Sequence, residues 1–294
     1  MPNYVDLHMH TTASDGLYSP TELMHRVKEA GLRAVALTDH DTTNGIEEAA
    51  QTARALDVEF IPGIEINTDV SGGEVHVLGY FIEYQRPAFQ STIKALRDAR
   101  ERRGERMVEL LNEEGIAIRW ERVREIAQGS VGRPHIAQAL MEAGYVQSVS
   151  EAFDKYIGNG KPAYVPRYKL TPGDAVRLIG SANGLPVIAH PISLPGLEIL
   201  RTWLPDLKAA GLVGLETYYG QYTQKDEQAL LAIAHQYDLI ATGGTDFHGP
   251  GLHPTPLGGR YVPYKAVEQL KAVEAKRRGT MPPPFTLPTP VAEK

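Results

Sequence analysis

The segment Asp6-Leu7-His8-Met9-His10-Thr11 guides the interpretation of the whole chain, because it places two histidines on alternate residues of a short apolar stretch. In an extended strand, alternate side chains point to the same side, so His8 and His10 share one face. Two imidazoles held on one strand can bind a single metal ion. A lone pair of this kind can equally be solvated or hydrogen-bonded, so the choice depends on what the other strands supply.

Short apolar runs, polar loops and helical patterns alternate along most of the chain. These patterns predict strands over 34–37, 60–61, 186–190, 213–216 and 239–242, and helices over 19–31, 45–56, 197–210, 226–237 and from 172 onward. Gly72-Gly73 joins two further apolar runs, 64–68 and 75–80, in a predicted hairpin. Short strand–helix connections are typical of parallel βα units. Six or seven strands of this kind predict an α/β barrel of parallel strands, whose carboxyl ends carry the chemistry.

Residues 87–166 break this alternation, because they show helical patterns without apolar strands between them. Nine of the thirteen residues in 94–106 are charged, with opposite charges four apart in Arg97–Glu101 and Lys94–Asp98. This pattern favours a solvated helix face whose charges pair with one another. We therefore expect a discontinuous barrel (1–86 and 167–280), a helical insertion lying over the site (87–166) and a proline-rich, poorly ordered tail (281–294).

The amino-acid composition excludes several classes of functional site. The chain of 294 residues is 42% hydrophobic and 22% charged, which is typical of a globular protein with a large core. It has no cysteine, so disulfides, thiolate metal sites and cysteine nucleophiles are excluded. The net charge of −6 argues against a large nucleic-acid-binding surface. The chain shows no long apolar run and no signal peptide, so we expect a cytoplasmic protein with no membrane segment and no obligate protein partner.

Histidines and carboxylates occur at one predicted strand end after another. They are His8, His10, Asp15, Asp39, His40, Glu65, His76, His190, Asp246 and His248. This set exceeds what one four-coordinate ion needs, so two or three ions that share a carboxylate explain it better. Imidazole and carboxylate ligands suit Mn²⁺, Fe²⁺ or Zn²⁺. His25 and His235 lie in predicted helices and His253 lies in a Gly/Pro loop, and we assign them no role.

Five separated motifs resemble those of the PHP (polymerase and histidinol phosphatase) phosphoesterases. They are Asp-Leu-His-Met-His-Thr at 6–11, Leu-Thr-Asp-His-Asp at 37–41, Gly-Ile-Glu-Ile at 63–66, Ala-His-Pro at 189–191 and Gly-Thr-Asp-Phe-His at 244–248. Gly-Arg-Pro-His at 132–135 and Lys-Pro-Ala-Tyr-Val at 161–165 resemble the stand-alone branch of the family. That branch includes enzymes that remove the 3′-phosphate of nucleoside 3′,5′-bisphosphates and trim short RNA from the 5′ end.

The resemblance implies a distorted (β/α)7 barrel of the TIM type with a site for three metal ions. One ion would bind His8, His10, Glu65 and Asp246, a second would share Glu65 and add His76 and His190, and a third would bind Asp15, His40 and His248. Every ligand position of the family is filled in this chain. How the ligands divide among the ions stays open.

The resemblance also implies a reaction, the hydrolysis of a phosphate ester of a small nucleotide or a short 5′-phosphorylated oligonucleotide. Glu65 and Asp246 would hold the catalytic metals. Two adjacent ions lower the pKa of a bridging water from about 15.7 toward neutral, and the hydroxide then attacks phosphorus without a covalent intermediate.

Several cationic residues are candidates for binding the substrate. Arg133 can grip two phosphate oxygens with its planar guanidinium, and His135 can donate a hydrogen bond or protonate the leaving group. His248 and Lys161 are further candidates. Lys161 and Arg167 can equally be surface cations.

Other residues near the motifs are expected to be structural. We expect Asp39 to orient His40 or His10, Thr11 and Thr38 to make local hydrogen bonds, Gly243-Gly244 to let the last strand turn tightly, and Tyr218 and Tyr219 to pack at the barrel rim rather than stack on a base. Two other functions remain open. One is a phosphatase for a non-nucleotide metabolite such as histidinol phosphate. The other is a catalytically silent metal- or nucleotide-binding regulator, which would need a missing ligand or a blocked pocket, and the sequence shows neither.

Overall fold

The computed structural model describes residues 4–70, 73–127, 131–166, 170–252, 254–280 and 282–288, and its centre is a seven-stranded sheet. The strands neighbour one another in sequence order: β1 (Val5–Asp6), β2 (Ala34–Leu37), β3 (Glu59–Val70), β4 (Gly73–Tyr80), β5 (Leu185–Ile188), β6 (Gly214–Tyr219) and β7 (Ile240–Gly244). The backbone N–H of Leu7 donates to the carbonyl of Gly243 (3.1 Å), and Met9 forms a parallel bridge with Phe247. These contacts join the two edge strands and close the predicted barrel.

One strand of the barrel runs against its neighbours. β4 pairs antiparallel with β3 and β5, whereas the other neighbouring pairs are parallel. The predicted hairpin is therefore confirmed, and β4 is antiparallel because the hairpin reverses the chain there. β3 is also longer than predicted, since residues 59–62 pair with β2 and residues 63–70 pair with β4.

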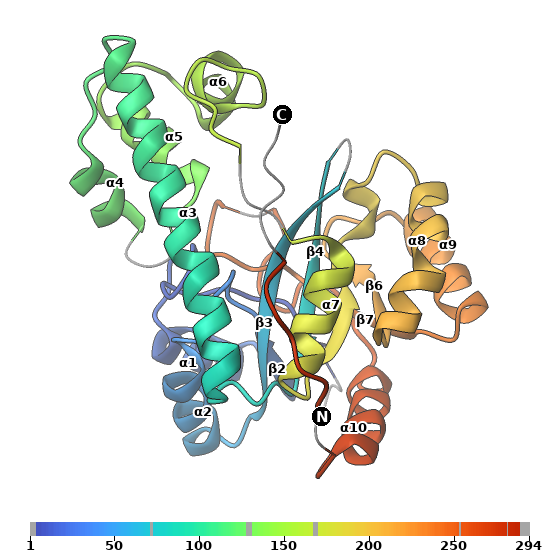
Figure 1. The fold of residues 1–294 in the computed structure, drawn as a ribbon. Coiled ribbons are helices and arrows are strands. Elements are labelled where there is room, and N and C mark those ends of the chain that lie inside the picture. Colours follow the sequence, from blue (N-terminus) through green and yellow to red (C-terminus); the bar gives the residue numbers. More distant parts are fainter. Residues whose placement is uncertain are drawn as a thin grey trace.

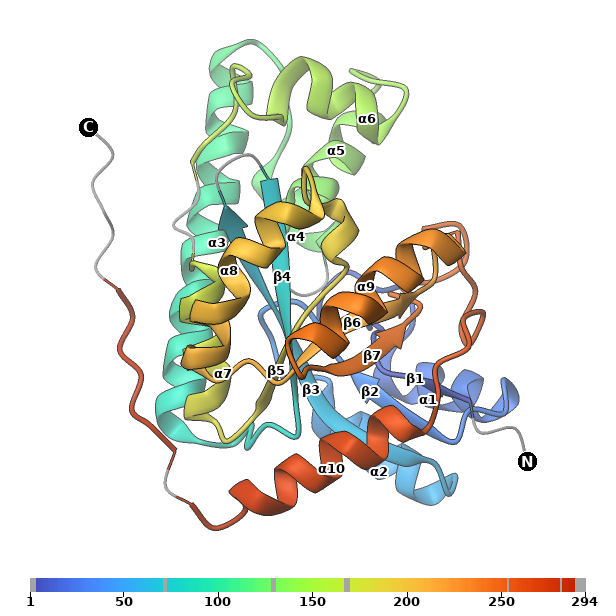
Figure 2. The same ribbon diagram turned by 90° about the vertical axis from the view of Figure 1, so that its right-hand side faces the viewer.

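In the part of the chain that the structure describes, helices surround the barrel (Figure 1). They are α1 (Pro20–Glu29), α2 (Ile46–Ala55), α7 (Pro172–Ser181), α8 (Leu197–Ala210), α9 (Gln224–Gln236) and α10 (Lys265–Arg277), with a short 3₁₀ turn η2 (Pro191–Ser193) after β5. α1 begins with a capping box, in which Ser19 and Glu22 each bond the backbone N–H of the other. Figure 2 shows α10, a helix that the sequence pattern did not predict, across one end of the barrel. Its Val267 and Leu270 pack with the apolar side chains inside the barrel.

The insertion is helical, as expected. It contains α3 (Pro87–Glu113), α4 (Trp120–Ala127), α5 (Arg133–Glu142), α6 (Val149–Ala152) and a π-helical turn η1 (Phe153–Ile157). α3 joins two cores, because Phe89 and Ile93 pack with the barrel whereas Met107 and Leu111 pack with the other helices of the insertion. The smaller helices gather at the far end of α3 (Figure 1). One long helix, α3, therefore connects the core of the insertion to the barrel.

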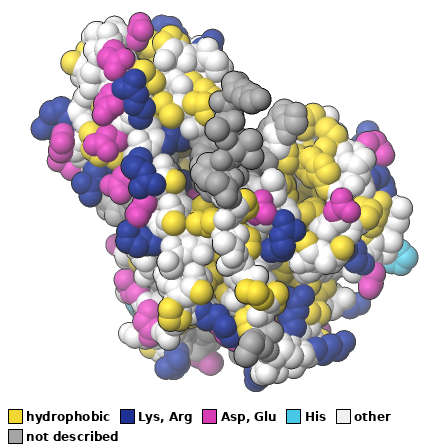
Figure 3. All heavy atoms as spheres, viewed as in Figure 1, with side chains coloured by type: hydrophobic (Ala, Val, Ile, Leu, Met, Phe, Trp, Pro, Cys, Tyr) yellow, Lys and Arg dark blue, Asp and Glu magenta, His cyan; other side chains and the backbone are white. Residues whose placement is uncertain are grey.

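The charged stretch of α3 is only partly self-paired. Lys94 pairs with Asp98 as predicted (Nζ···Oδ2 2.7 Å). The predicted pair between Arg97 and Glu101 is wrong, because Glu101 pairs with Arg124 of α4 and Arg97 turns toward a barrel loop. Acidic and basic side chains are mixed over the outer surface of the insertion, at the upper left of Figure 3.

The segment after α10 follows the barrel surface. Phe285 and Leu287 are partly buried against the barrel core. Residues 282–288 therefore contact the barrel through these two side chains. Within the described ranges, no helix is long and apolar enough to cross a membrane.

Candidate metal centre

Four fully or almost fully buried residues converge just beyond β1. Nε2 of His8 lies 3.2 Å from Oε2 of Glu65 and 3.2 Å from Oδ1 of Asp246. Nε2 of His10 lies 3.2 Å and 3.0 Å from the same two oxygens. One atom from each of the four residues lies within 4.8 Å of the others, which is a spacing that can hold a metal ion. The family resemblance implied this group as the ligands of one ion.

Glu65 lies between this group and a second one. Its Oε2 faces His8, His10 and Nδ1 of His40 (3.0 Å). Its Oε1 faces Nδ1 of His76 (2.8 Å) and Nε2 of His190 (3.1 Å). The two oxygens of one carboxylate are thus directed at different sets of histidines, which is the arrangement expected of a bridging ligand.

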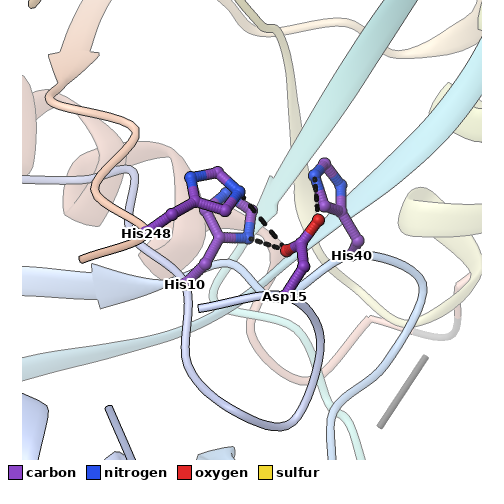
Figure 4. Close-up of side chains that lie close together, drawn as sticks. All are labelled: His10, Asp15, His40 and His248. Atoms are coloured by element: carbon purple, nitrogen blue, oxygen red, sulfur yellow. Dashed lines mark ion pairs between the residues drawn. The ribbon is translucent and has the colours of Figure 1, made fainter. Parts of the chain in front are cut away.

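A third group forms around Asp15, on the loop after β1 (Figure 4). Oδ1 of Asp15 lies 3.3 Å from Nε2 of His248, and Oδ2 lies 3.8 Å from Nε2 of His40. His10 also takes part, because its Nδ1 lies 3.8 Å from Oδ1 of Asp15. The predicted third set is therefore brought together, with His10 as an additional member.

Backbone geometry at the strand ends points these side chains inward. His190 and Asp246 have positive φ angles of 27° and 53°, a region that non-glycine residues seldom occupy and that is typical of functional sites. A Cβ on Gly244 would lie 2.6 Å from Cβ of His8, and one on Gly243 would lie 2.1 Å from the carbonyl of Tyr218. The two glycines therefore allow β7 to approach its neighbours closely, and the expectation that they serve a tight turn is wrong.

Two supporting residues were not predicted in this role. Glu216 is buried on β6, where Oε1 lies 3.0 Å from Nδ1 of His8 and Oε2 accepts the backbone N–H of His190 (2.7 Å). The Tyr219 hydroxyl donates to Oδ2 of Asp246 (2.8 Å). Tyr219 does pack among aromatic rings, as expected, but it also positions a carboxylate. The available signal was the placement of both residues at the carboxyl end of a buried strand.

Asp39 has a different role from the one predicted. Its Oδ1 accepts the backbone N–H of Thr11 and the hydroxyl of Ser14, and its Oδ2 accepts the hydroxyl of Thr11, all at 2.7 Å. The carboxylate thus holds the loop that leads to Asp15 instead of orienting a histidine ring. The expected local bonds of Thr11 and Thr38 are present, since the Thr38 hydroxyl donates to the carbonyl of Met9 (3.2 Å).

The clusters carry strong opposing charges. Burial raises the pKa of Glu65, but His40 and His8 outweigh it and hold that pKa well below its usual range. Burial lowers the pKa of His10, but Asp246 and Glu65 outweigh it and raise that pKa to about 10. Ionised carboxylates in a buried site attract cations.

The arrangement of hydrogen bonds also fits a metal. Nδ1 of His8 lies 3.0 Å from Glu216, which holds the ring so that Nε2 faces Glu65, the place where a bound cation would replace the Nε2 proton. Both ring nitrogens of His10 and Nδ1 of His40 are buried without a hydrogen-bond partner of good geometry among the described residues. Imidazole and carboxylate together suit a divalent transition metal. The residues present therefore fit the predicted metals.

The insertion places its predicted residues on the first turn of α5. Nδ1 of His135 accepts the backbone N–H of Gly132 (2.9 Å), and the Arg133 guanidinium lies 5.0 Å from the centre of the Phe153 ring. Burial lowers the pKa of His135, and the charge of Asp15 opposes this shift, so His135 lies within electrostatic range of the third group. Lys161 is exposed on the insertion, and its part in substrate binding stays a prediction.

Four other residues singled out in the sequence lie away from the clusters or outside the described residues. His25 and His235 are exposed on α1 and α9. The positions of Arg167 and His253 lie outside the described residues.

The PHP domain family matches residues 6–163 of the chain. The chain is 35% identical over 252 residues to a 5′-3′ exoribonuclease from Haemophilus influenzae, an alignment that covers 85% of this chain and 92% of that protein. It is 34% identical over 254 residues to a 3′,5′-nucleoside bisphosphate phosphatase from Chromobacterium violaceum, with 84% and 88% covered. A solved structure from Bifidobacterium adolescentis, of a protein inferred to be a metal-dependent phosphoesterase, matches with a TM-score of 0.81, 31% identity and coverage of 93% and 97%. The chain therefore belongs to the PHP domain family.

Proposed function

We propose that the three clusters bind two to three divalent metal ions and that the protein hydrolyses a phosphate ester of a nucleoside 3′,5′-bisphosphate or of a short 5′-phosphorylated oligonucleotide. One ion would be held by His8, His10, Glu65 and Asp246, a second by Glu65, His76 and His190, and a third by Asp15, His40 and His248. The geometry of Glu65 carries the proposal, because its two oxygens face different sets of histidines, at 2.8 Å to His76 and 3.0 Å to His40.

The protein's own residues prepare this site for a phosphate ester. When bound, neighbouring metal ions lower the pKa of water to about 7 and neutralise phosphoryl oxygens. Glu65 and Asp246 supply the buried negative charge that holds the cations close together. Glu216 holds the ring of His8 so that Nε2 faces Glu65, and Asp39 holds the loop that carries Asp15. The mutual positions are therefore set by protein contacts before substrate arrives.

The first turn of α5 supplies the contacts to phosphate. Because the N–H of Gly132 donates to Nδ1 of His135, the proton of the neutral ring lies on Nε2. In this form His135 can donate a hydrogen bond to a phosphoryl oxygen, and it has no second proton for the leaving group. Arg133, on the same turn, can bind two phosphate oxygens with its guanidinium. The nucleotide enzymes among the relatives support a nucleotide as the substrate.

Phosphate release by the Mn²⁺-reconstituted protein tests this proposal. We expect faster release from adenosine 3′,5′-bisphosphate, or faster cleavage of a 5′-phosphorylated RNA trimer, than release from histidinol phosphate. Elemental analysis should find two to three metal ions per chain, and Glu65→Gln should lose both metal and turnover. A preference for histidinol phosphate would contradict the nucleotide assignment, and less than about one metal ion per chain after reconstitution would contradict the metal centre.

A further inference from the structure

A small cleft lies beside the metal clusters, between α3 and the barrel loops. It has a volume of about 270 Å³. Its walls include Ala13, which is two residues before Asp15, and Val131, which is two residues before Arg133. The cleft therefore borders both the loop of the third cluster and the start of the proposed phosphate-binding turn.

Two cations of α3 line this cleft, Lys94, which pairs with Asp98, and Arg97. Nη1 of Arg97 donates to the hydroxyl of Thr42 (2.9 Å) and to Oδ1 of Asn44 (3.2 Å), both of which are neutral. These two bonds leave Nε and Nη2 of the half-buried guanidinium for another partner. Arg97 is therefore held in place by the barrel without a carboxylate bound to it within the described part of the chain.

The acidic residues that line the cleft have other partners. Asp98 forms its ion pair with Lys94 (2.7 Å), and Glu101 forms its own with Arg124 (3.1 Å). Arg97 is close enough to help lower the pKa of Asp98, although the hydrogen bond from Lys94 is the larger cause. The positive charge of Arg97 is therefore available to an anion that enters the cleft.

A second arginine connects Arg97 with the metal clusters. Arg100, three residues further along α3, binds Oδ2 of Asp41 (2.8 Å), the residue that follows His40. The charge of Arg100 also contributes to the lowered pKa of His135, after the larger effect of burial. Positive and hydrogen-bond-donating groups thus extend from His135 past Arg100 to Arg97, away from the metal ligands.

We propose that this cleft binds a second phosphate group of the substrate, the one that is not hydrolysed, and that Arg97 determines specificity for it. The inference rests on the proposed function. A guanidinium held at one nitrogen presents its remaining N–H groups in a fixed fork, which matches two oxygens of a phosphate. The second phosphate can belong to a nucleoside bisphosphate or to the 5′ end of a short RNA, because both present the same monoester dianion.

The test measures kcat/KM of the reconstituted protein for adenosine 3′,5′-bisphosphate and for 3′-AMP, which lacks the second phosphate. We expect the wild-type protein to prefer the bisphosphate, and Arg97→Gln to reduce this preference about 10- to 100-fold, the range for one charge-assisted contact. Arg97→Lys should keep part of the preference, because it keeps the charge but loses the fork. Arg106→Gln is the matched control, since Arg106 lies on the same helix but pairs with Glu109 and Glu113 at the surface.

The same measurement on RNA trimers with and without a 5′-phosphate shows whether the second phosphate comes from a nucleoside bisphosphate or from the 5′ end of an RNA. If Arg97→Gln reduces the preference for the second phosphate only among the trimers, the cleft binds the 5′ end of an RNA. If it reduces the preference among the mononucleotides, the cleft binds the second phosphate of a bisphosphate. The inference would be overturned if Arg97→Gln and the wild-type protein showed the same ratio of kcat/KM, with and without the second phosphate, for both the mononucleotides and the trimers. Continued phosphate release from 3′-AMP would show that the variant is still active. If the wild-type protein cleaved none of these esters, the proposed function itself would be wrong.

Discussion

Glu216 and His8 form a buried contact across the barrel, with Oε1 of Glu216 lying 3.0 Å from Nδ1 of His8. The other oxygen of Glu216 accepts the backbone N–H of His190 (2.7 Å). One carboxylate therefore positions two histidines that face the same bridging residue, Glu65. With a metal ion at Nε2, Glu216 would keep the remaining proton of His8 on Nδ1, the nitrogen that points away from Glu65.

Glu216→Gln is predicted to weaken metal binding. The amide keeps an oxygen for the N–H of His190, but it lacks the negative charge that supports a metal-bound imidazole. We expect metal affinity to fall about 10- to 100-fold, as measured by competition with a chelator. Glu198→Gln is the control, because the side chain of Glu198 is 90% exposed. Equal affinities for the two variants would show that Glu216 has only a structural role.

Tyr219→Phe is predicted to loosen Asp246. Its hydroxyl donates to the Oδ2 of Asp246 (2.8 Å), and a hydrogen bond to a charged group contributes about 1.5–3 kcal/mol. We expect a loss of about that size in the free energy of unfolding of the metal-free protein, together with weaker metal retention. Denaturant unfolding and metal titration measure the two effects. Tyr261→Phe serves as the control, since Tyr261 is 58% exposed, and identical results for the two variants would contradict the role of Tyr219.

The metal clusters could be predicted because their members occupy repeated positions in the sequence. His8, His40 and His190 each follow an apolar run, and parallel strands bring their carboxyl ends to one edge of a barrel. Glu65 lies within β3 instead of after it, yet the pairing of β3 with β4 places it opposite Leu78, between the other groups. Strand position therefore indicated that these residues meet, but it gave neither the full set of ligands nor the distances between them.

The supporting contacts could not be predicted, because each depends on residues that are distant along the chain. Glu216 meets His8 across 208 positions. Arg97 has a favourable partner four residues away in Glu101, but α3 lies against the barrel and turns Arg97 toward Thr42. The rule that opposite charges four residues apart pair on a helix considers the helix alone. The packing of the helix against the barrel decides which of its sides is exposed.

Arg133→Ala is predicted to impair substrate binding without loss of metal. Arg133 lies on α5 of the insertion, which is separate from the barrel residues that form the clusters. We expect kcat/KM for phosphate monoesters to fall about 10- to 100-fold, mainly through KM, because one charge-assisted contact to phosphate is lost. Elemental analysis of the same samples should find an unchanged metal content. Unchanged kinetics would remove Arg133 from the substrate site.

His135→Gln is predicted to make stability less dependent on pH. Burial lowers the pKa of His135, the nearby charge of Arg100 lowers it further, and Asp15 acts in the opposite direction. Because the pKa is lower in the folded state, the unfolded chain binds more protons, and stability is lost as the pH falls below about 6.5. Glutamine can accept the N–H of Gly132 at this helical position but does not titrate.

We therefore expect the free energy of unfolding of the metal-free wild-type protein to fall more between pH 7.5 and pH 5.5 than that of His135→Gln. The histidines of the metal clusters titrate in both proteins, so their contribution cancels in the difference. Denaturant unfolding at the two pH values measures it. Parallel changes in the two proteins would show that His135 titrates in the folded state as it does in the unfolded chain, and its assigned environment beside Arg100 would then be wrong.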